Sequence, residues 1–171
     1  MTLPPRDGAE PAERRDVYSL QMQPLLEVTI TRPWHWGVAV ISAPSAVLPD
    51  GIGNKSFVAS PDALVITVRH AQDVDAEPFE GDWALGVASL HVRSLAGFED
   101  VAGPAVYDGV LDLPESRLQV GDADSYLTID HLWNRTRVRV YGDLQAAPGA
   151  TSVQIDLAPE ATADSSGRGT G

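Results

Sequence analysis

The chain has 171 residues, of which 12 are Lys or Arg and 24 are Asp or Glu, so its formal net charge is −12. A chain this acidic is poorly suited to grip a phosphate backbone, because that affinity comes from Lys and Arg. It contains no Cys, which excludes disulfide bonds and thiolate chemistry. We therefore expect neither direct nucleic-acid binding nor a thiol enzyme.

The sequence predicts one folded domain between two polar ends. Residues 1–16 are rich in Pro, Ala, Glu and Arg without a hydrophobic period, which is typical of a disordered arm. Residues 158–171 are small and polar and predict a disordered tail, leaving residues 17–157 as the domain. No apolar run approaches the roughly 20 residues of a membrane helix, and no apolar core of a secretory signal follows the start. We expect a cytoplasmic protein without a membrane anchor.

The first half of the chain shows repeated strand patterns. Leu26, Val28 and Ile30 alternate with polar residues, which indicates a half-buried strand. Residues 37–42 are apolar on both sides, which is typical of a central, covered strand. Residues 43–54 carry Pro and Gly and predict a surface loop. Further strands are predicted over residues 63–70 and 83–92, the second with small residues that allow a close approach of backbone.

The stretch over residues 105–142 alternates most clearly. In its last part Val138 and Val140 alternate with arginines, so we expect the valines to face the core. Turns are predicted at Pro114, over residues 121–124 and over residues 131–134. A final strand is predicted over residues 151–157.

These elements add up to roughly eight to ten strands and almost no helix. They predict an all-β chain folded as a two-layer antiparallel β-sandwich, because a sheet with one apolar face needs a second layer over it. A jelly roll or a partly open barrel is the alternative. Exposed sheet edges would allow a homo-oligomer.

Acidic residues without a base fill residues 71–82. They are a candidate recognition surface for a basic protein partner, with a solvated loop as the plainer interpretation. Calcium is a third interpretation, although the spacing of an EF-hand loop is absent. The residues concerned are Asp73, Asp75, Glu77, Glu80 and Asp82.

A row of three arginines stands on this negative chain, formed by Arg135, Arg137 and Arg139. One interpretation is cross-strand pairing with acids such as Asp112, Asp130 or Asp156. The functional interpretation is contact with an anion or a carboxylate of a partner.

Trp34 and Trp36 stand two positions apart, which puts both rings on one face if the segment is a strand. They would then form an aromatic platform for a sugar or another ring-shaped ligand, or cover one end of the core.

The sequence shows no catalytic motif. His35, His70, His91 and His131 are far apart, and neither HxH nor HExxH occurs. The spacing around Ser89 does not match the nucleophile elbow GxSxG. We therefore predict no catalytic, cofactor-binding or metal-ligating residue, with an enzyme site assembled from distant loops as an alternative.

The order of strands resembles that of the competence protein J family, small acidic inhibitors of a DNA-entry nuclease. The matching pattern runs from residues 110–113 through Pro114 to residues 116–120, then through strands at 127–130, 137–141 and 153–156. The turn before the aromatic strand departs from the family, since Leu132, Trp133 and Asn134 stand where a Pro-Gly turn is usual. The resemblance implies a sandwich that binds and inhibits a protein, and no binding residue is carried over.

Together these observations favour a non-catalytic, protein-binding β-sandwich that inhibits or masks a basic partner such as a nuclease. The alternative is a small-ligand or carbohydrate binder that uses tryptophans, among them Trp83 and Trp133.

Overall fold

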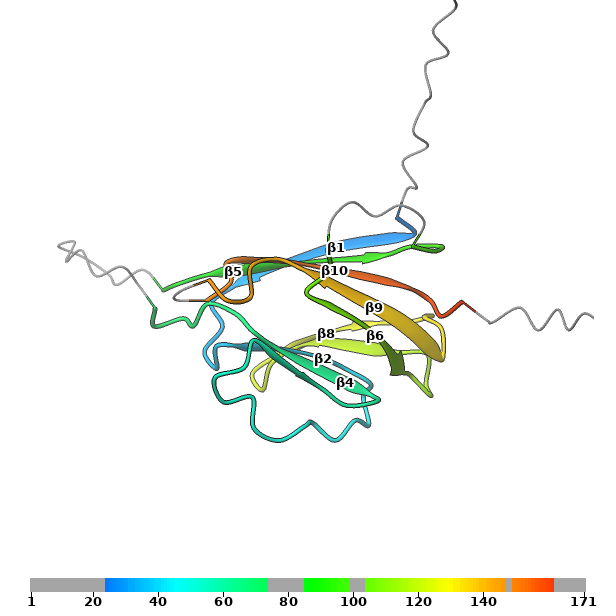
Figure 1. Ribbon diagram of the computed structural model, residues 1–171, viewed down its shortest axis with the longest axis horizontal. Coiled ribbons are helices and arrows are strands. Elements are labelled where there is room, and N and C mark those ends of the chain that lie inside the picture. Colours follow the sequence, from blue (N-terminus) through cyan, green and yellow to red (C-terminus); the bar gives the residue numbers. More distant parts are fainter. Residues whose placement is uncertain (1–23, 74–84, 99–103, 147–148, 162–171) are drawn as a thin grey trace, which may run out of the picture.

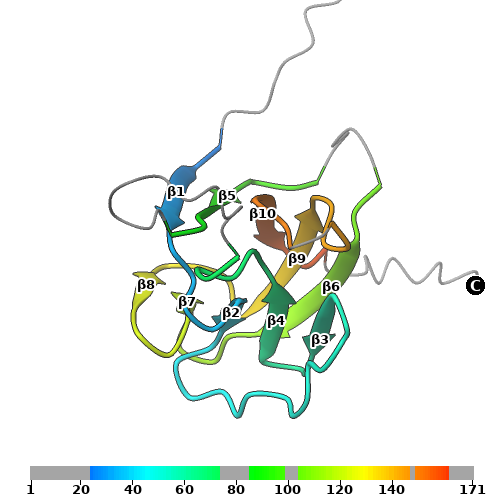
Figure 2. The same ribbon diagram turned by 90° about the vertical axis from the view of Figure 1, so that its left-hand side faces the viewer.

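Two five-stranded sheets stack face to face in the computed structural model (Figure 1), which describes residues 24–73, 85–98, 104–146 and 149–161. The described residues contain strands, turns and loops, and among them no helix is long and apolar enough to cross a membrane. The view along the strands in Figure 2 separates the two layers. The prediction of an all-β sandwich is confirmed.

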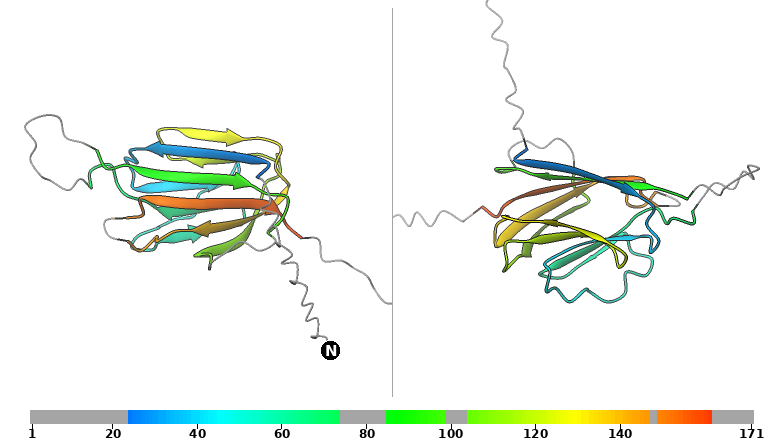
Figure 3. Two further views of the ribbon diagram at one scale, coloured as in Figure 1. Left: turned by 90° about the horizontal axis from the view of Figure 1, so that it is seen from above. Right: turned by 180° about the vertical axis from the view of Figure 1, so that it is seen from behind.

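Each sheet combines strands that are far apart in the sequence. In spatial order, sheet A consists of β1 (Leu26–Arg32), β5 (Ala88–Ser94), β10 (Ser152–Pro159), β9 (Arg135–Tyr141) and β6 (Tyr107–Asp112). Sheet B consists of β3 (Phe57–Ala59), β4 (Ala63–Thr67), β2 (Val38–Ser42), β7 (Leu118–Gly121) and β8 (Tyr126–Ile129). Figure 3 shows sheet A from above.

One pairing departs from the predicted antiparallel arrangement. β10 pairs with β5 in parallel, from Ser152 opposite Ser89 to Leu157 opposite Ser94. The other strand pairs are antiparallel within the described residues. Between β5 and β10 the chain passes through β6 of the same sheet, through β7 and β8 of sheet B, and back through β9. Parallel strands need a long connection of this kind.

The core lies between the sheets and is built from the inward-facing apolar residues of both. Val138 and Val140 of β9 are fully buried, as the alternation predicts. The opposite layer contributes Ile41 from β2 and Leu64 and Ile66 from β4. Burial of this kind stabilises a fold by about 25 cal/mol per Å² of apolar surface removed from water.

β2 occupies the predicted central position, between β4 and β7. Its inner residues Ala39 and Ile41 are fully buried. Its outer residues Val38 and Val40 are only half-buried, since among the described residues the loop after β2 passes over that face and no second layer of strands covers it. The prediction that both sides are covered is therefore wrong for the outer side.

Several strand boundaries also differ from the prediction. The strand predicted over residues 63–70 is β4, which ends at Thr67. β5 begins at Ala88, whereas the prediction began the strand at residue 83. Residues 83 and 84 lie outside the described residues. Before it, the Gly86 N–H donates to Ala71 O, at a point where a Cβ would lie 2.9 Å from His70 O. β10 continues past Leu157 to Pro159, because Ala158 is buried and the strand still pairs with β9. The predicted arm over residues 1–16 lies outside the described residues, as do residues 162–171 of the tail predicted over residues 158–171, whose first two residues belong to β10.

Candidate functional site

The outer face of sheet A carries a row of alternating charges that crosses every strand of the sheet. The pairing register places Glu27 opposite Arg93, Arg93 opposite Asp156, Asp156 opposite Arg139 and Arg139 opposite Asp108. Opposite charges on directly facing residues stabilise a sheet, typically by 0.2–1 kcal/mol per pair. This face is therefore polar but close to neutral along the row.

The arginine row belongs to this face, and each of its members is already paired. Arg137 Nε donates to Asp108 Oδ1 at 2.7 Å, and Arg139 Nε donates to Asp108 Oδ2 at 3.0 Å. The hydrogen bond from Arg137 is the largest effect on Asp108 and lowers the pKa of that carboxyl, with Arg139 adding to it and burial opposing it. Both guanidinium groups also lie over the Phe98 ring, Arg139 at 4.4 Å from its centroid.

The remaining arginine of the row pairs in the same manner. Arg135 Nη1 donates to Asp112 Oδ1 at 3.1 Å and its Nε donates to Glu160, and this hydrogen bond lowers the pKa of Glu160. The predicted pairing with Asp112 is confirmed. The other two acids predicted as partners of the row pair elsewhere, Asp130 with Arg117 and Asp156 with Arg93.

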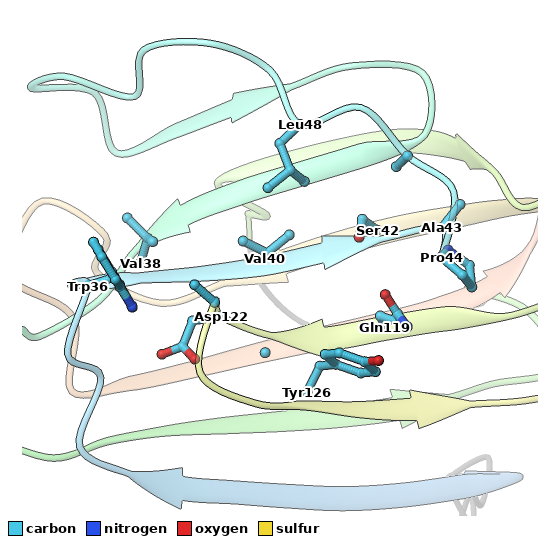
Figure 4. Close-up of a pocket in the computed structure, with 13 residues that line it drawn as sticks. Trp36, Val38, Val40, Ser42, Ala43, Pro44, Leu48, Gln119, Asp122 and Tyr126 are labelled. Atoms are coloured by element: carbon cyan, nitrogen blue, oxygen red, sulfur yellow. The ribbon is translucent and has the colours of Figure 1, made fainter.

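The outer face of sheet B is apolar and holds a groove of about 380 Å³ (Figure 4). Val38 and Val40 form its floor, Leu48 stands on one side and Tyr126 on the other, and Trp36 stands at one end. Trp36 is 61% exposed and Tyr126 is 63% exposed. Large aromatic rings on an exposed apolar surface are the residues that most often anchor a bound molecule. The other lining residues are Ser42, Ala43, Pro44, Ala46, Gln119, Gly121, Asp122 and Ala123.

Asp122 lies beside Trp36 at the end of the groove (Figure 4). Its side chain is buried, with 1% exposure, and its Oδ1 accepts from the backbone N–H groups of Asp124 and Ser125 and from Arg32 Nη2 at 2.9 Å. The Oδ2 atom is buried without a hydrogen-bond partner. Buried polar atoms in folded proteins are nearly always paired, so this oxygen is the exceptional polar atom of the site.

The predicted platform of Trp34 and Trp36 does not exist, because the two rings lie on different sides of the chain. Trp34 is fully buried, and its indole Nε1 donates to Ala88 O at 3.0 Å. The segment is a turn rather than a strand, closed by a hydrogen bond from Gly37 N to Trp34 O, with Gly37 at φ +63°. Gly adopts this left-handed conformation without strain. Trp36 therefore keeps a surface position, and Trp34 covers the core.

Of the predicted acidic surface, the structure describes Asp73 alone. Its Oδ2 accepts from the His70 N–H, and its backbone oxygen accepts from Arg69. The other four residues, together with Trp83, lie outside the described residues, so their predicted role stays a prediction. Trp133 is half-buried and packs against the core.

Sequence patterns did not reveal the residues that join Trp36 in forming the groove. The alternation puts Tyr126 on the outer side of its strand, and the predicted turn over residues 121–124 indicates that β7 and β8 are neighbours. Nothing in the sequence shows that this pair lies next to β2. Leu48 lies in a loop whose position over sheet B has no sequence signal. A partial signal exists for Asp122, because Asp followed by small residues is typical of a turn in which the carboxylate binds the backbone.

Within the described residues, no group of three or more His, Asp or Glu side chains is placed to hold a metal ion. The polar groups of the groove are the Asp122 carboxylate, the Gln119 amide, the hydroxyl groups of Ser42 and Tyr126, and the Trp36 indole N–H. These groups accept and donate hydrogen bonds, and the rest of the lining offers apolar contact. The arrangement is therefore suited to binding.

No protein-family model and no curated protein matches this chain. Among solved structures, the chain is similar in fold to ComJ, the inhibitor of the DNA degrading activity of NucA from Bacillus subtilis, with a TM-score of 0.51 and 9% identity over 81% of this chain and 98% of that one. A second structure, the product of crocagin biosynthetic gene J, has a TM-score of 0.42 and 14% identity over 79% of this chain and 96% of that one. The likeness to ComJ shows a shared β-sandwich fold.

Proposed function

We propose that this chain is a non-catalytic protein-binding module that captures a basic protein and inhibits or masks it. The observation that carries the proposal is the distribution of charge. The chain has a net charge of −12, and the described arginines of both sheets are largely occupied by its own carboxylates. The ion-paired arginines are Arg32, Arg93, Arg117, Arg135, Arg137 and Arg139.

With these cations occupied, the surplus of carboxylates sets the field that an approaching molecule meets. Such a field steers oppositely charged proteins toward the chain and raises the rate of association. It repels the phosphate backbone of a nucleic acid for the same reason. A basic protein, such as a nuclease with a cationic substrate cleft, is the partner class that this surface suits.

The fold likeness supports the same class of function. ComJ is an inhibitor of the DNA degrading activity of NucA. A protein that covers a cationic cleft competes with DNA for it, and an acidic β-sandwich can do so without any catalytic group. We propose inhibition of a nuclease as the specific form of the function.

The proposal is tested by titrating the purified chain into a DNA-degradation assay of NucA and of basic nucleases from the organism that encodes the chain. We expect stoichiometric inhibition of at least one of them, with an affinity that falls by about tenfold or more when NaCl is raised from about 50 to 300 mM. An affinity independent of salt would contradict electrostatic capture, and no inhibition or binding at low salt would contradict the proposed function.

Two matched variants distinguish a contribution of the acidic segment over residues 71–82 to partner binding from a contribution of the net charge of the chain. One variant neutralises the acidic segment and the other removes the same charge from exposed positions elsewhere. If the acidic segment forms the contact, only the first variant loses inhibition. The first carries Asp75→Asn, Glu77→Gln, Glu80→Gln and Asp82→Asn, and the second carries Asp50→Asn, Glu115→Gln, Asp124→Asn and Asp143→Asn.

A further inference from the structure

The groove on the outer face of sheet B has the size, lining and polar groups of a binding site. We propose that it receives an extended segment of the partner protein, which inserts one apolar side chain over Val38 and Val40 and donates a neutral N–H to Asp122. This inference rests on the proposed function, because it assigns the partner's contact to a particular face of the molecule.

A glycine at an outward position of β7 allows β8 to approach closely beside the groove. The pairing register places Gly121 between Val40 of β2 and Tyr126 of β8. A Cβ at Gly121 would lie 2.2 Å from Ser125 O and 2.4 Å from Tyr126 Cα, so no other residue fits. The glycine therefore lets the turn between β7 and β8 pack closely against β7, and this brings Tyr126 to the side of the groove whose floor includes Val40.

The lining of the groove favours an apolar side chain over a sugar. Val38 and Val40 form an aliphatic floor, and Pro44, Ala46 and Leu48 add further apolar lining. Sugar hydroxyl groups that lie directly over Val38 and Val40 would lose water without gaining a hydrogen bond from these side chains, which costs free energy. A leucine-like side chain gains from the same contact, and the exposed Trp36 and Tyr126 rings at the rim add area to it.

The unpaired Oδ2 of Asp122 specifies the polar part of the ligand. Arg32 already neutralises the carboxylate through Oδ1, at 2.9 Å. The other oxygen, Oδ2, has no hydrogen-bond donor. Because the charge of the carboxylate is already balanced by Arg32, a neutral donor is sufficient to satisfy Oδ2. A backbone N–H of an extended peptide is a neutral donor that lies next to an apolar side chain. Because Oδ2 is enclosed, the donor reaches it only when a rim group moves, and the exposed Trp36 ring lies beside it (Figure 4).

The groove can be tested with small probes in solution. We would titrate the ¹⁵N-labelled full chain with N-acetyl-leucinamide, N-acetylglycinamide or methyl glucoside at up to about 50 mM, because ligands of this size bind weakly. We expect saturable NMR shifts of the Trp36 indole N–H and of the Val40 and Gly121 amides with the leucine derivative. The glycine derivative should bind at least about tenfold more weakly, because it lacks the buried side chain.

Two neighbouring loop residues provide a matched control. Leu48 lines the groove, whereas Val47 is 82% exposed and does not. Leu48→Ala should weaken N-acetyl-leucinamide binding several-fold, and Val47→Ala should leave it unchanged. Asp122→Asn should also weaken it, because the amide presents a donor in place of one acceptor oxygen.

The inference is overturned if the leucine derivative gives no saturable shifts, if the glycine derivative binds equally well, or if methyl glucoside binds more tightly than either. Equal effects of Leu48→Ala and Val47→Ala would also overturn it. The proposed function fails separately. If the chain binds N-acetyl-leucinamide but shows no salt-dependent inhibition, the proposed capture of a basic partner is wrong. If the chain inhibits a nuclease but does not bind N-acetyl-leucinamide, only the assignment of the groove as the contact is wrong.

Discussion

Arg93 and Asp156 face each other across the parallel pairing of β5 and β10, and their side chains form two hydrogen bonds of 2.8 and 2.7 Å. The Asp156 side chain is fully buried although it lies on the outer face of sheet A. The Gln154 amide also donates to both of its carboxylate oxygens, at 3.2 Å. The carboxylate therefore depends on these two residues in place of water, at the point where the sheet departs from antiparallel pairing.

Removing the partner of this carboxylate should destabilise the fold. We expect Arg93→Met to lower the free energy of unfolding by about 3 kcal/mol, because it leaves a buried charge with Gln154 as its remaining neutral donor. Urea denaturation measures the change. Arg117→Met breaks an exposed pair with Asp130 and should cost less than about 1 kcal/mol. Equal costs of the two substitutions would contradict the importance of burial.

The stability of the fold should depend on the ionisation of Asp108 in acid. Hydrogen bonds from Arg137 and Arg139 lower the pKa of Asp108 below its ordinary value of 3.8. The unfolded chain then binds the proton more readily, so this carboxylate stabilises the fold above its ordinary pKa and loses that effect as the pH falls through the lower, folded pKa. We expect Asp108→Asn to decline less steeply than the wild type below about pH 4 in urea denaturations. Asp50→Asn, on an exposed loop, is the control, and parallel curves for Asp108→Asn and the wild type would refute the coupling.

Phe57 and Tyr107 join the two sheets at one side of the sandwich. They belong to β3 and β6, the edge strands of opposite sheets, and their rings meet edge to face with centroids 5.4 Å apart. A double-mutant cycle of Phe57→Leu and Tyr107→Leu should give a coupling energy of about 0.5–1.5 kcal/mol. Strictly additive effects in thermal or urea denaturation would show that the rings contribute through burial alone.

The two neighbouring tryptophans should respond differently to the same substitution. Trp34→Phe removes the donor to Ala88 O inside the core and should cost about 1–3 kcal/mol. Trp36→Phe changes an exposed ring and should stay within about 0.5 kcal/mol. Urea denaturation gives both values, and acrylamide should quench Trp36 fluorescence far more than that of Trp34. A similar cost for both substitutions would contradict the assignment of one ring to the core and the other to the surface.

The sequence by itself determined the local alternation of inward-facing and outward-facing side chains along the strands. Every-second-residue alternation was sufficient to place Val138 and Val140 in the core and the arginines between them outside, since successive side chains of a strand face opposite sides. It was not sufficient at Trp34 and Trp36, because a turn has a different geometry from a strand and the same spacing then separates the rings. The outward position of the arginines was predictable, but two of their acid partners lie on the distant strand β6.

Only the tertiary structure decided which strands became neighbours, and therefore where a site exists. The groove combines β2, the loop after it, and the hairpin of β7 and β8, and these segments meet only because β7 pairs with β2 across a long stretch of sequence. The register places Gly121 between Val40 and Tyr126, where only a glycine permits the close approach of β8. Alternation specifies which face a side chain occupies, whereas the register between distant strands specifies what lies beside it, because that register depends on the packing of the whole core.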